Sequence, residues 1–273
     1  KYPYLLKEIE TPPFCLYCKG NIELFNTTCF GIVGSRKPTD YGLVITKQFA
    51  KELAENNVTI VSGLAVGVDT IAHKSALEVN GNTIAVLGGG FKHIYPAINS
   101  GLAKQIAENN LLISEYNPNI APETYYFIAR NRIIAGLSRG VLVTEAGEKS
   151  GSLKTINFAI DFNREIFAVP GKINSPMSKG TNGLIKTLQG CVALEPKDIL
   201  EALNLTQSQK AKPNLQLDMN AQIVLNYIQT EKKSFQELTD LTKVPVKELN
   251  TMLMELEMEG LISKLSGNFY IMN

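Results

Sequence analysis

The feature that most constrains the fold is an alternation of short apolar runs with longer segments of helical periodicity. Each apolar run is strand-sized, and most end at Gly, Ser or Thr, a pattern typical of strands buried on both faces of a parallel sheet. The predicted strands are residues 29–33, 58–61, 83–87, 111–113, 141–144, 166–169 and a weaker 191–193. The predicted helices are residues 40–55, 69–79, 102–108, 129–137, 153–162 and 198–203. This order predicts an α/β fold, a doubly wound parallel sheet of six or seven strands covered by helices on both faces.

The chain changes character after residue 203. Residues 204–213 are polar and poor in apolar side chains, which indicates a linker. Three helices and a β-hairpin are expected beyond it, at 221–228, from Ser234 with Glu237 as its capping-box partner, at 246–259, and around Ser266-Gly267. We therefore expect a large domain at 1–203, a linker at 204–213 and a small winged-helix domain at 214–273.

Composition excludes several protein classes. Of the 273 residues, 44% are hydrophobic and 19% charged, as in a globular chain that buries a core. No apolar run reaches the roughly 18 residues of a membrane span, so we expect no membrane partner and a cytoplasmic protein. Cys15 and Cys18 form one CxxC pair, but no second pair exists and only two histidines are present. We expect reduced thiols and neither a metal site nor a cofactor.

Charge is divided unevenly along a chain whose net charge is only +1. Residues 213–273 hold five Lys and eight Asp or Glu, so that of the 27 basic and 26 acidic residues in the whole chain, 22 and 18 fall in the remainder. Residues 1–212 are thus net +4 and residues 213–273 net −3. An anionic ligand is expected on the large domain.

Gly, Ser and basic residues follow most of the predicted strands. Because ligands bind at the carboxyl ends of strands in an open parallel sheet, these segments predict one phosphate-binding rim, formed by backbone N–H groups and helix N-termini. Its candidate residues are Gly34, Ser35, Arg36, Lys37, Ser62, Gly63, Gly67, Lys149, Ser150, Gly151, Ser152 and Lys172. The rim lacks the GxGxxG of dinucleotide sites and the GxxxxGK[ST] of P-loops, which argues against NAD or ATP in their usual mode.

A segment before the fifth strand favours a polynucleotide ligand. Phe127 stands beside Arg130, Asn131 and Arg132. Arg forks bind phosphates, and an exposed aromatic ring stacks on an unpaired base. The alternative is that Phe127 belongs to the core and that one Arg pairs with Glu115 or Glu145.

Catalytic residues are poorly supported by the sequence. Ser150 and Ser152 have no evident base, and no GxSxG elbow occurs. His73, on a predicted helix, is interpreted as a structural hydrogen-bonding residue. Asp69 is interpreted as the cap of that helix.

Several motifs occur together and in order along the chain. They are Gly34-Ser35-Arg36, Ser62-Gly63-Leu64-Ala65, Gly67-Val68-Asp69, Ala72-His73, Tyr95-Pro96, Ser114-Glu115, Arg130-Asn131-Arg132, Ser150-Gly151-Ser152, Pro170-Gly171 and Gly180-Thr181-Asn182-Gly183-Leu184-Ile185. In these motifs the chain resembles the bacterial DNA-processing family DprA, also called Smf, and the resemblance runs from about residue 2 to residue 203. The resemblance implies an extended Rossmann domain that binds single-stranded DNA without catalysis and forms a homodimer. It also implies protection of incoming DNA and loading of the RecA recombinase during natural transformation, and many members carry a C-terminal winged helix.

The sequence departs from this family at two positions. Ile128 stands where members often have Pro, and Thr124 stands where a basic residue would help to bind DNA. We therefore expect the affinity to depend more on Arg36 and Lys37, with Phe127 stacking on a base and Lys149 adding a phosphate contact.

The small domain differs in charge from the large one, and the chain is also compatible with two other functions. The third helix of the small domain carries Glu248, Glu255, Glu257 and Glu259 against Lys247, which favours a protein contact or regulatory role over duplex DNA reading. One alternative for the whole chain is a nucleotide-binding phosphoribohydrolase-like enzyme, although its PGGxGTxxE signature is absent and Glu145-Ala146-Gly147 is a poor substitute. The other is a nucleotide-sensing module.

Overall fold

The computed structural model describes residues 2–205, 218–229, 231–265 and 267–272. The chain forms two compact units, Lys1–Ser208 (the larger unit) and Gln209–Asn273 (the smaller unit). Each unit has its own cluster of buried apolar side chains. Of the predicted linker, residues 206–213 lie outside the described residues.

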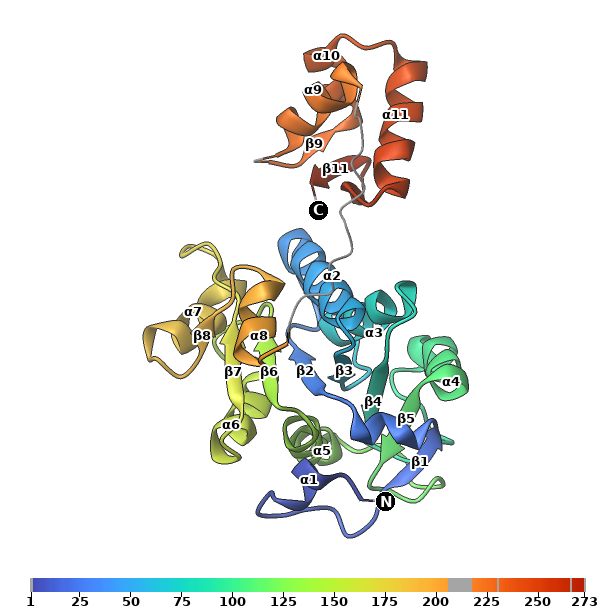
Figure 1. The fold of residues 1–273 in the computed structure, drawn as a ribbon, viewed down its shortest axis with the longest axis vertical. Coiled ribbons are helices and arrows are strands. Elements are labelled where there is room, and N and C mark those ends of the chain that lie inside the picture. Colours follow the sequence, from blue (N-terminus) through green and yellow to red (C-terminus); the bar gives the residue numbers. More distant parts are fainter. Residues whose placement is uncertain (1, 206–217, 230, 266, 273) are drawn as a thin grey trace. The chain divides into compact units, whose positions relative to one another are not determined.

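The larger unit is built on an eight-stranded sheet (Figure 1). The strands are β1 (Tyr17–Gly20), β2 (Cys29–Val33), β3 (Thr59–Ser62), β4 (Thr83–Leu87), β5 (Leu111–Ser114), β6 (Gly140–Val143), β7 (Glu165–Ala168) and β8 (Cys191–Val192). Their order in the sheet is β1-β5-β4-β3-β2-β6-β7-β8, and all neighbouring strands are parallel except β1 and β5. The predicted parallel sheet is confirmed, and the strand order reverses direction between β2 and β6.

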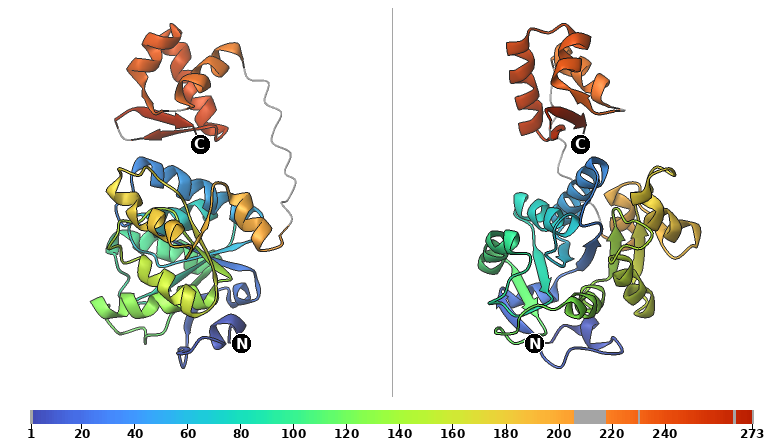
Figure 2. Two further views of the ribbon diagram at one scale, coloured as in Figure 1. Left: turned by 90° about the vertical axis from the view of Figure 1, so that its left-hand side faces the viewer. Right: turned by 180° about the vertical axis from the view of Figure 1, so that it is seen from behind.

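Helices cover both faces of this sheet (Figure 2). One face packs against α5 and α6, and the other against α2, α3 and α8. The helices are α1 (Tyr4–Lys7), α2 (Asp40–Glu55), α3 (Val68–Glu78), α4 (Ser100–Asn109), α5 (Thr124–Leu137), α6 (Leu153–Asp161), α7 (Lys179–Lys186) and α8 (Pro196–Ala202), with short 3₁₀ turns η1 (Ile22–Asn26), η2 (Ala97–Asn99) and η3 (Pro176–Ser178).

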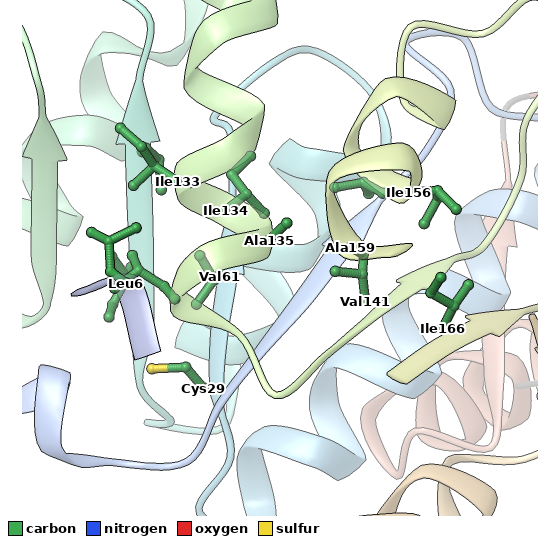
Figure 3. Close-up of a cluster of buried hydrophobic side chains, with 14 of the residues drawn as sticks. Leu6, Cys29, Val61, Ile133, Ile134, Ala135, Val141, Ile156, Ala159 and Ile166 are labelled. Atoms are coloured by element: carbon green, nitrogen blue, oxygen red, sulfur yellow. The ribbon is translucent and has the colours of Figure 1, made fainter. Parts of the chain in front are cut away.

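The strands are apolar because both of their faces are buried. Every residue of β2 and of β4 is buried. Figure 3 shows Ile133 and Ile134 of α5 and Ile156 of α6 gathered with Val61 and Val141 of the sheet. Each such side chain contributes about 1.5–3 kcal/mol when fully buried, so this layer holds α5 and α6 firmly on the sheet. The N-terminal ends of both helices are thereby positioned beside the carboxyl ends of the strands.

The sequence analysis did not predict α1, β1 or α7, and it placed the start of α5 too late. Strand β1 has one half-buried residue and three exposed ones, so it carries no apolar periodicity. Helix α5 begins at Thr124 rather than at residue 129, because its first turn is aromatic and half-exposed rather than amphipathic. Helix α7 contains two glycines that indicated a loop, yet Gly180 lies so close to the backbone of Gly147 and Ala146 that no side chain would fit.

The smaller unit has the predicted winged-helix pattern. It comprises α9 (Met219–Ile228), β9 (Lys233–Ser234), α10 (Phe235–Thr242), α11 (Val246–Met258), β10 (Ile262–Leu265) and β11 (Phe269–Met272). The capping box at α10 is confirmed: the Glu237 amide donates to Ser234 Oγ at 3.2 Å, and the Ser234 amide donates to Glu237 Oε2 at 2.7 Å. The hairpin β10–β11 is also confirmed, and the unpredicted β9 extends it to three strands.

Candidate functional site

A pocket of about 540 Å³ opens in the larger unit where the strand order reverses direction. This is the crevice at which open α/β sheets bind ligands. It is lined by the last residue of β2, by residues that follow β2, β3, β4 and β6, and by residues of α5. They are Val33, Gly34, Arg36, Ala65, Asp69, Tyr95, Thr124, Phe127, Ile128, Arg130, Asn131, Ile134, Ser150, Gly151, Ser152, Lys154 and Thr155. Eight of the sixteen predicted site residues line this one pocket.

The loop after β2 is held in a tight path that leaves Arg36 exposed. A Cβ on Gly34 would lie 2.7 Å from Val68 Cγ2, so the loop tolerates no side chain there. The Ser35 amide donates to the Glu145 carbonyl at 2.8 Å, and Ser35 Oγ accepts the Lys37 amide at 3.0 Å. Ser35 is therefore buried and structural, Arg36 lines the pocket, and Lys37 is exposed outside its lining.

The loop after β3 supports the loop after β2. Gly67 has φ +83°, and a Cβ on it would collide with the carbonyl oxygen of Ser35. The next amide, of Val68, donates to the same Ser35 oxygen at 3.1 Å. Ser62 is fully buried and donates to the Ile32 carbonyl at 2.7 Å. Ser62, Gly63 and Gly67 thus shape the rim without lining the pocket.

Arg130 connects the loop after β3 to strand β4 through hydrogen bonds. Its Nη1 donates to the carbonyl oxygens of Gly63 and Val86, and its Nε donates to Asn131 Oδ1 at 3.3 Å. Burial lowers the pKa of Arg130 to about 10, Asp69 opposes this shift and Arg36 adds to it. Arg130 therefore stays charged at neutral pH, and it lines the pocket while bracing the loops.

Asp69 does not cap α3 as predicted. Its Oδ2 accepts the amides of Gly63 and Ala65, at 3.2 and 3.3 Å, in the loop that precedes the helix. The N-cap residue is Gly67, which has no side chain to serve as a cap. Burial raises the pKa of the Asp69 carboxyl, and Arg130 and these amides act against that shift.

The apolar wall of the pocket is aromatic. The half-buried Phe127 packs on Gly88, where a Cβ would lie 2.6 Å from the ring. Its ring centroid lies 5.4 Å from that of Tyr95, with the planes inclined at 44°. Tyr95 is 57% exposed and lines the pocket, although the sequence analysis did not select it. Its position in the loop after β4 was the available signal.

Arg132 points away from this pocket. Its Nη1 and Nη2 donate to the two carboxylate oxygens of Glu115 at 2.9 and 2.6 Å, and its Nε donates to the Thr11 carbonyl at 3.0 Å. The pairing with Glu115 that was weighed for one of the arginines belongs to Arg132. Glu145, the other acid considered, accepts the Thr39 amide and hydroxyl at 2.7 Å each, at the N-terminus of α2.

The turn that opens α6 forms another side of the pocket. Ser150, Gly151 and Ser152 all line it, and the two Ser hydroxyls lie 2.8 Å apart. Lys154, in the first turn of α6, also lines it and was not predicted. Lys149 and Lys172, which were predicted, are exposed outside the lining.

The pocket favours an anion that also carries a flat apolar group. Its lining contains the cations Arg36, Arg130 and Lys154 and one carboxylate, that of Asp69.

His73 is buried with its Nδ1 2.7 Å from Thr83 Oγ1, and burial lowers its pKa to about 3, so its structural interpretation is confirmed.

The described residues offer neither a metal-ion cluster nor a membrane-spanning helix. Within the described residues, no three His, Cys, Asp or Glu side chains form a group that could hold a metal ion. No helix in the described part of the chain combines the length and apolar character needed to cross a bilayer.

Two family models match this chain. The model described as DNA recombination-mediator protein A matches residues 1–204, and the DprA winged helix domain matches residues 208–268. DNA processing protein DprA of Bacillus subtilis is 42% identical over 215 residues, covering 78% of this chain and 72% of its own length. Protein Smf of Escherichia coli is 39% identical over 279 residues, covering 98% of this chain and 74% of its own length.

Two solved structures share the fold. DNA processing protein A of Streptococcus pneumoniae aligns with a TM-score of 0.71 at 42% identity, over 73% of this chain and 70% of its own. The protein of the same name from Helicobacter pylori aligns with a TM-score of 0.70 at 35% identity, over 75% of this chain and 93% of its own. The Helicobacter structure concerns a single-stranded DNA binding mode of that protein.

Proposed function

This chain belongs to the DprA family of DNA recombination-mediator proteins, and we propose that it binds single-stranded DNA in the pocket between β2 and β6. One unpaired base lies against the wall of Phe127 and Tyr95. The backbone phosphate lies against Arg36 and the amides at the N-terminus of α6.

The observation that carries this proposal is that aromatic rings and cations line the same pocket. A ring that stacks on a base is worth about 1–3 kcal/mol and accepts any base, because every base has a π-face. In a duplex both faces of a base are covered by its neighbours, so the wall is accessible only to an unpaired strand. The cations bind phosphates irrespective of sequence. Preference for single strands without sequence preference follows.

The proposed role is binding without a catalytic step. The acids nearest the pocket are already engaged, since Asp69 accepts two loop amides and Glu145 accepts Thr39. His73 is buried and neutral. The phosphoribohydrolase-like alternative predicts release of free base from nucleoside monophosphates, and the nucleotide-sensing alternative predicts a mononucleotide that binds more tightly than an oligonucleotide.

The finer parts of the proposal rest on family resemblance. They are a homodimer formed through the larger unit, protection of incoming DNA, loading of RecA during natural transformation, and a cytoplasmic location. Phosphate contacts by Ser35, Lys37, Ser62, Gly63, Gly67, Asn131, Arg132, Lys149 and Lys172 also stay predictions.

The decisive test replaces Arg36 and Lys37 together with Ala. We expect affinity for a fluorescent poly-dT oligonucleotide to fall on the order of 10- to 100-fold, because each cation contributes a charge-assisted contact. The slope of log K against log salt should become shallower by about 1.4, at about 0.7 per contact. The single variants should differ. Arg36→Ala should bind more weakly than Lys37→Ala, because Arg36 lines the pocket and Lys37 does not.

The matched control is Lys74→Ala, which removes an exposed Lys of α3 outside the pocket. It should bind as the unchanged protein does. Undiminished single-strand affinity in the double variant, or equal affinity of the unchanged protein for duplex DNA, would refute the proposal.

A further inference from the structure

Lys154 occupies an unusual place in the first turn of α6. Its side chain is exposed and lines the same pocket as Arg36 and Ser152. No ion pair or side-chain hydrogen bond of Lys154 occurs within the described residues. Its charge is thus not neutralised by the protein at a site that already holds Arg36 and the buried Arg130.

The helix itself gains nothing from this charge. The N-terminus of a helix carries positive partial charge, so a cation in the first turn is unfavourable and an acid is favourable. The first turn of α6 contains no acidic residue that would offset Lys154. A residue that breaks a local rule without a compensating contact in the protein points to a ligand. An anion bound between Lys154 and the helix N-terminus supplies that compensation.

A second residue of the pocket, at the start of α5, carries no charge. Thr124 is the first residue of α5 and lines the same pocket as Lys154. Thr124 is exposed and carries no charge. Thr124 and Lys154 come from different helices, yet both line one pocket.

We propose that Lys154, on α6, supplies a phosphate-binding cation to the pocket, to which α5 contributes the uncharged Thr124 at its N-terminus. The inference rests on the proposed binding of single-stranded DNA and names a further residue of that site. A Lys ammonium is a point charge on a flexible stem, without the fixed fork of Arg. Lys154 therefore strengthens binding to any sequence and does so in a salt-dependent manner.

The test is a charge-relocation experiment in the full chain. Lys154→Ala should weaken binding of poly-dT about 5- to 10-fold at low salt and reduce the salt slope by about 0.7. Thr124→Lys, added to Lys154→Ala, should restore most of the lost affinity and the slope. Lys154→Arg should keep both, and Lys74→Ala is the control for a lost exposed charge.

A structural role for Lys154 is excluded by a second readout. Since a cation opposes the helix dipole, the melting temperature of Lys154→Ala should equal or exceed that of the unchanged protein. A clear drop in melting temperature together with lost binding would overturn the inference.

Two results separate this inference from the proposed function. If Lys154→Ala binds as tightly as the unchanged protein while Arg36→Ala is weakened, Lys154 has no such role and the pocket is still the DNA site. If the unchanged protein shows no preference for single strands, the proposed function itself fails. Failure of Thr124→Lys to restore affinity would overturn the inference that Lys154 acts as a cation on a ligand shared by both positions.

Discussion

The two units of this chain place their charged side chains in different ways. In the larger unit, Arg36, Arg130 and Lys154 come from three separate segments and meet at one pocket. In the smaller unit, Glu255 and Glu257 near the end of α11 and Glu259 at its C-cap alternate with apolar residues. The first arrangement concentrates like charges where aromatic rings also lie, whereas the second spreads them over a helix surface.

The groove of the smaller unit is correspondingly mixed. About 390 Å³ in volume, it lies between α11 and the hairpin, and it is lined by Lys247, Asn250, Thr251, Met254, Glu257, Lys264 and Tyr270. It contains two cations and one acid, and Met254 is 66% exposed. A parallel sheet brings strand ends together from far along the chain, so it can gather several cations at one pocket.

Separating the units should give the largest contrast. A fragment ending at residue 205 should retain the single-strand affinity of the full chain within about 2-fold per subunit. A fragment from residue 218 should bind duplex DNA no more tightly than about 10⁻⁵ M at physiological salt, within the range of non-specific binding. Fluorescence anisotropy on both fragments measures this. Tight duplex binding by the small fragment would break the comparison.

Core truncations test whether the units are independent in stability. Phe49 is fully buried in the larger unit and Leu253 is 1% exposed in the smaller. Phe49→Ala should cost about 3–5 kcal/mol and Leu253→Ala about 2–5 kcal/mol in the free energy of unfolding. Calorimetry should show each variant lowering the transition of its own unit. A variant that shifts both transitions equally would indicate that the units unfold together.

The aromatic wall is tested by Phe127→Ala. Loss of one stacked base should cost about 1–3 kcal/mol, or roughly 5- to 150-fold in affinity, with little change in the salt slope. Arg36→Ala should change the slope, so the two effects are distinguishable. Tyr125→Ala is the control, since Tyr125 is 56% exposed and outside the pocket lining. Quenching of 2-aminopurine in the oligonucleotide should disappear only with Phe127→Ala.

The smallest effect expected is a pH dependence confined to the larger unit. The pKa of His73 is lowered to about 3 in the folded state, below its ordinary value of 6.5, so only the unfolded chain takes up the proton as pH falls. Stability should fall by about 1 kcal/mol between pH 6.5 and 5.5. Asp69, whose pKa is raised by burial, acts in the opposite sense, because its folded state takes up the proton more readily than the unfolded chain.

Urea unfolding of the larger unit at several pH values measures this effect. His73→Gln should flatten the dependence in that window, and the smaller unit, which has no His, should show none there. An unchanged slope in His73→Gln would mean that another group is responsible.

Most strands of the sheet were predictable because a strand buried on both faces is a continuous apolar run in the sequence. The apolar runs at β2 and β4 were located to the residue, since both faces of these strands are covered. Strand β1 gave no such signal, because it is an exposed edge strand held by pairing with β5. Helix α7 was missed for a related reason, as its Gly180 is required by backbone contacts with distant residues.

The sequence by itself determined the order of the elements, the positions at which strands end and the kinds of residue that follow them, because hydrophobic periodicity and turn chemistry are local properties. It also identified Phe127 and Arg36 as candidates. Only the tertiary structure decided that Arg36, Arg130 and Lys154 line one pocket whereas Lys37, Lys149 and Lys172 do not. The partner of Arg132 likewise became known only from the structure, in which it pairs with Glu115, seventeen positions away in the chain. A side chain's direction and partners depend on residues that folding brings beside it, and no local pattern contains them.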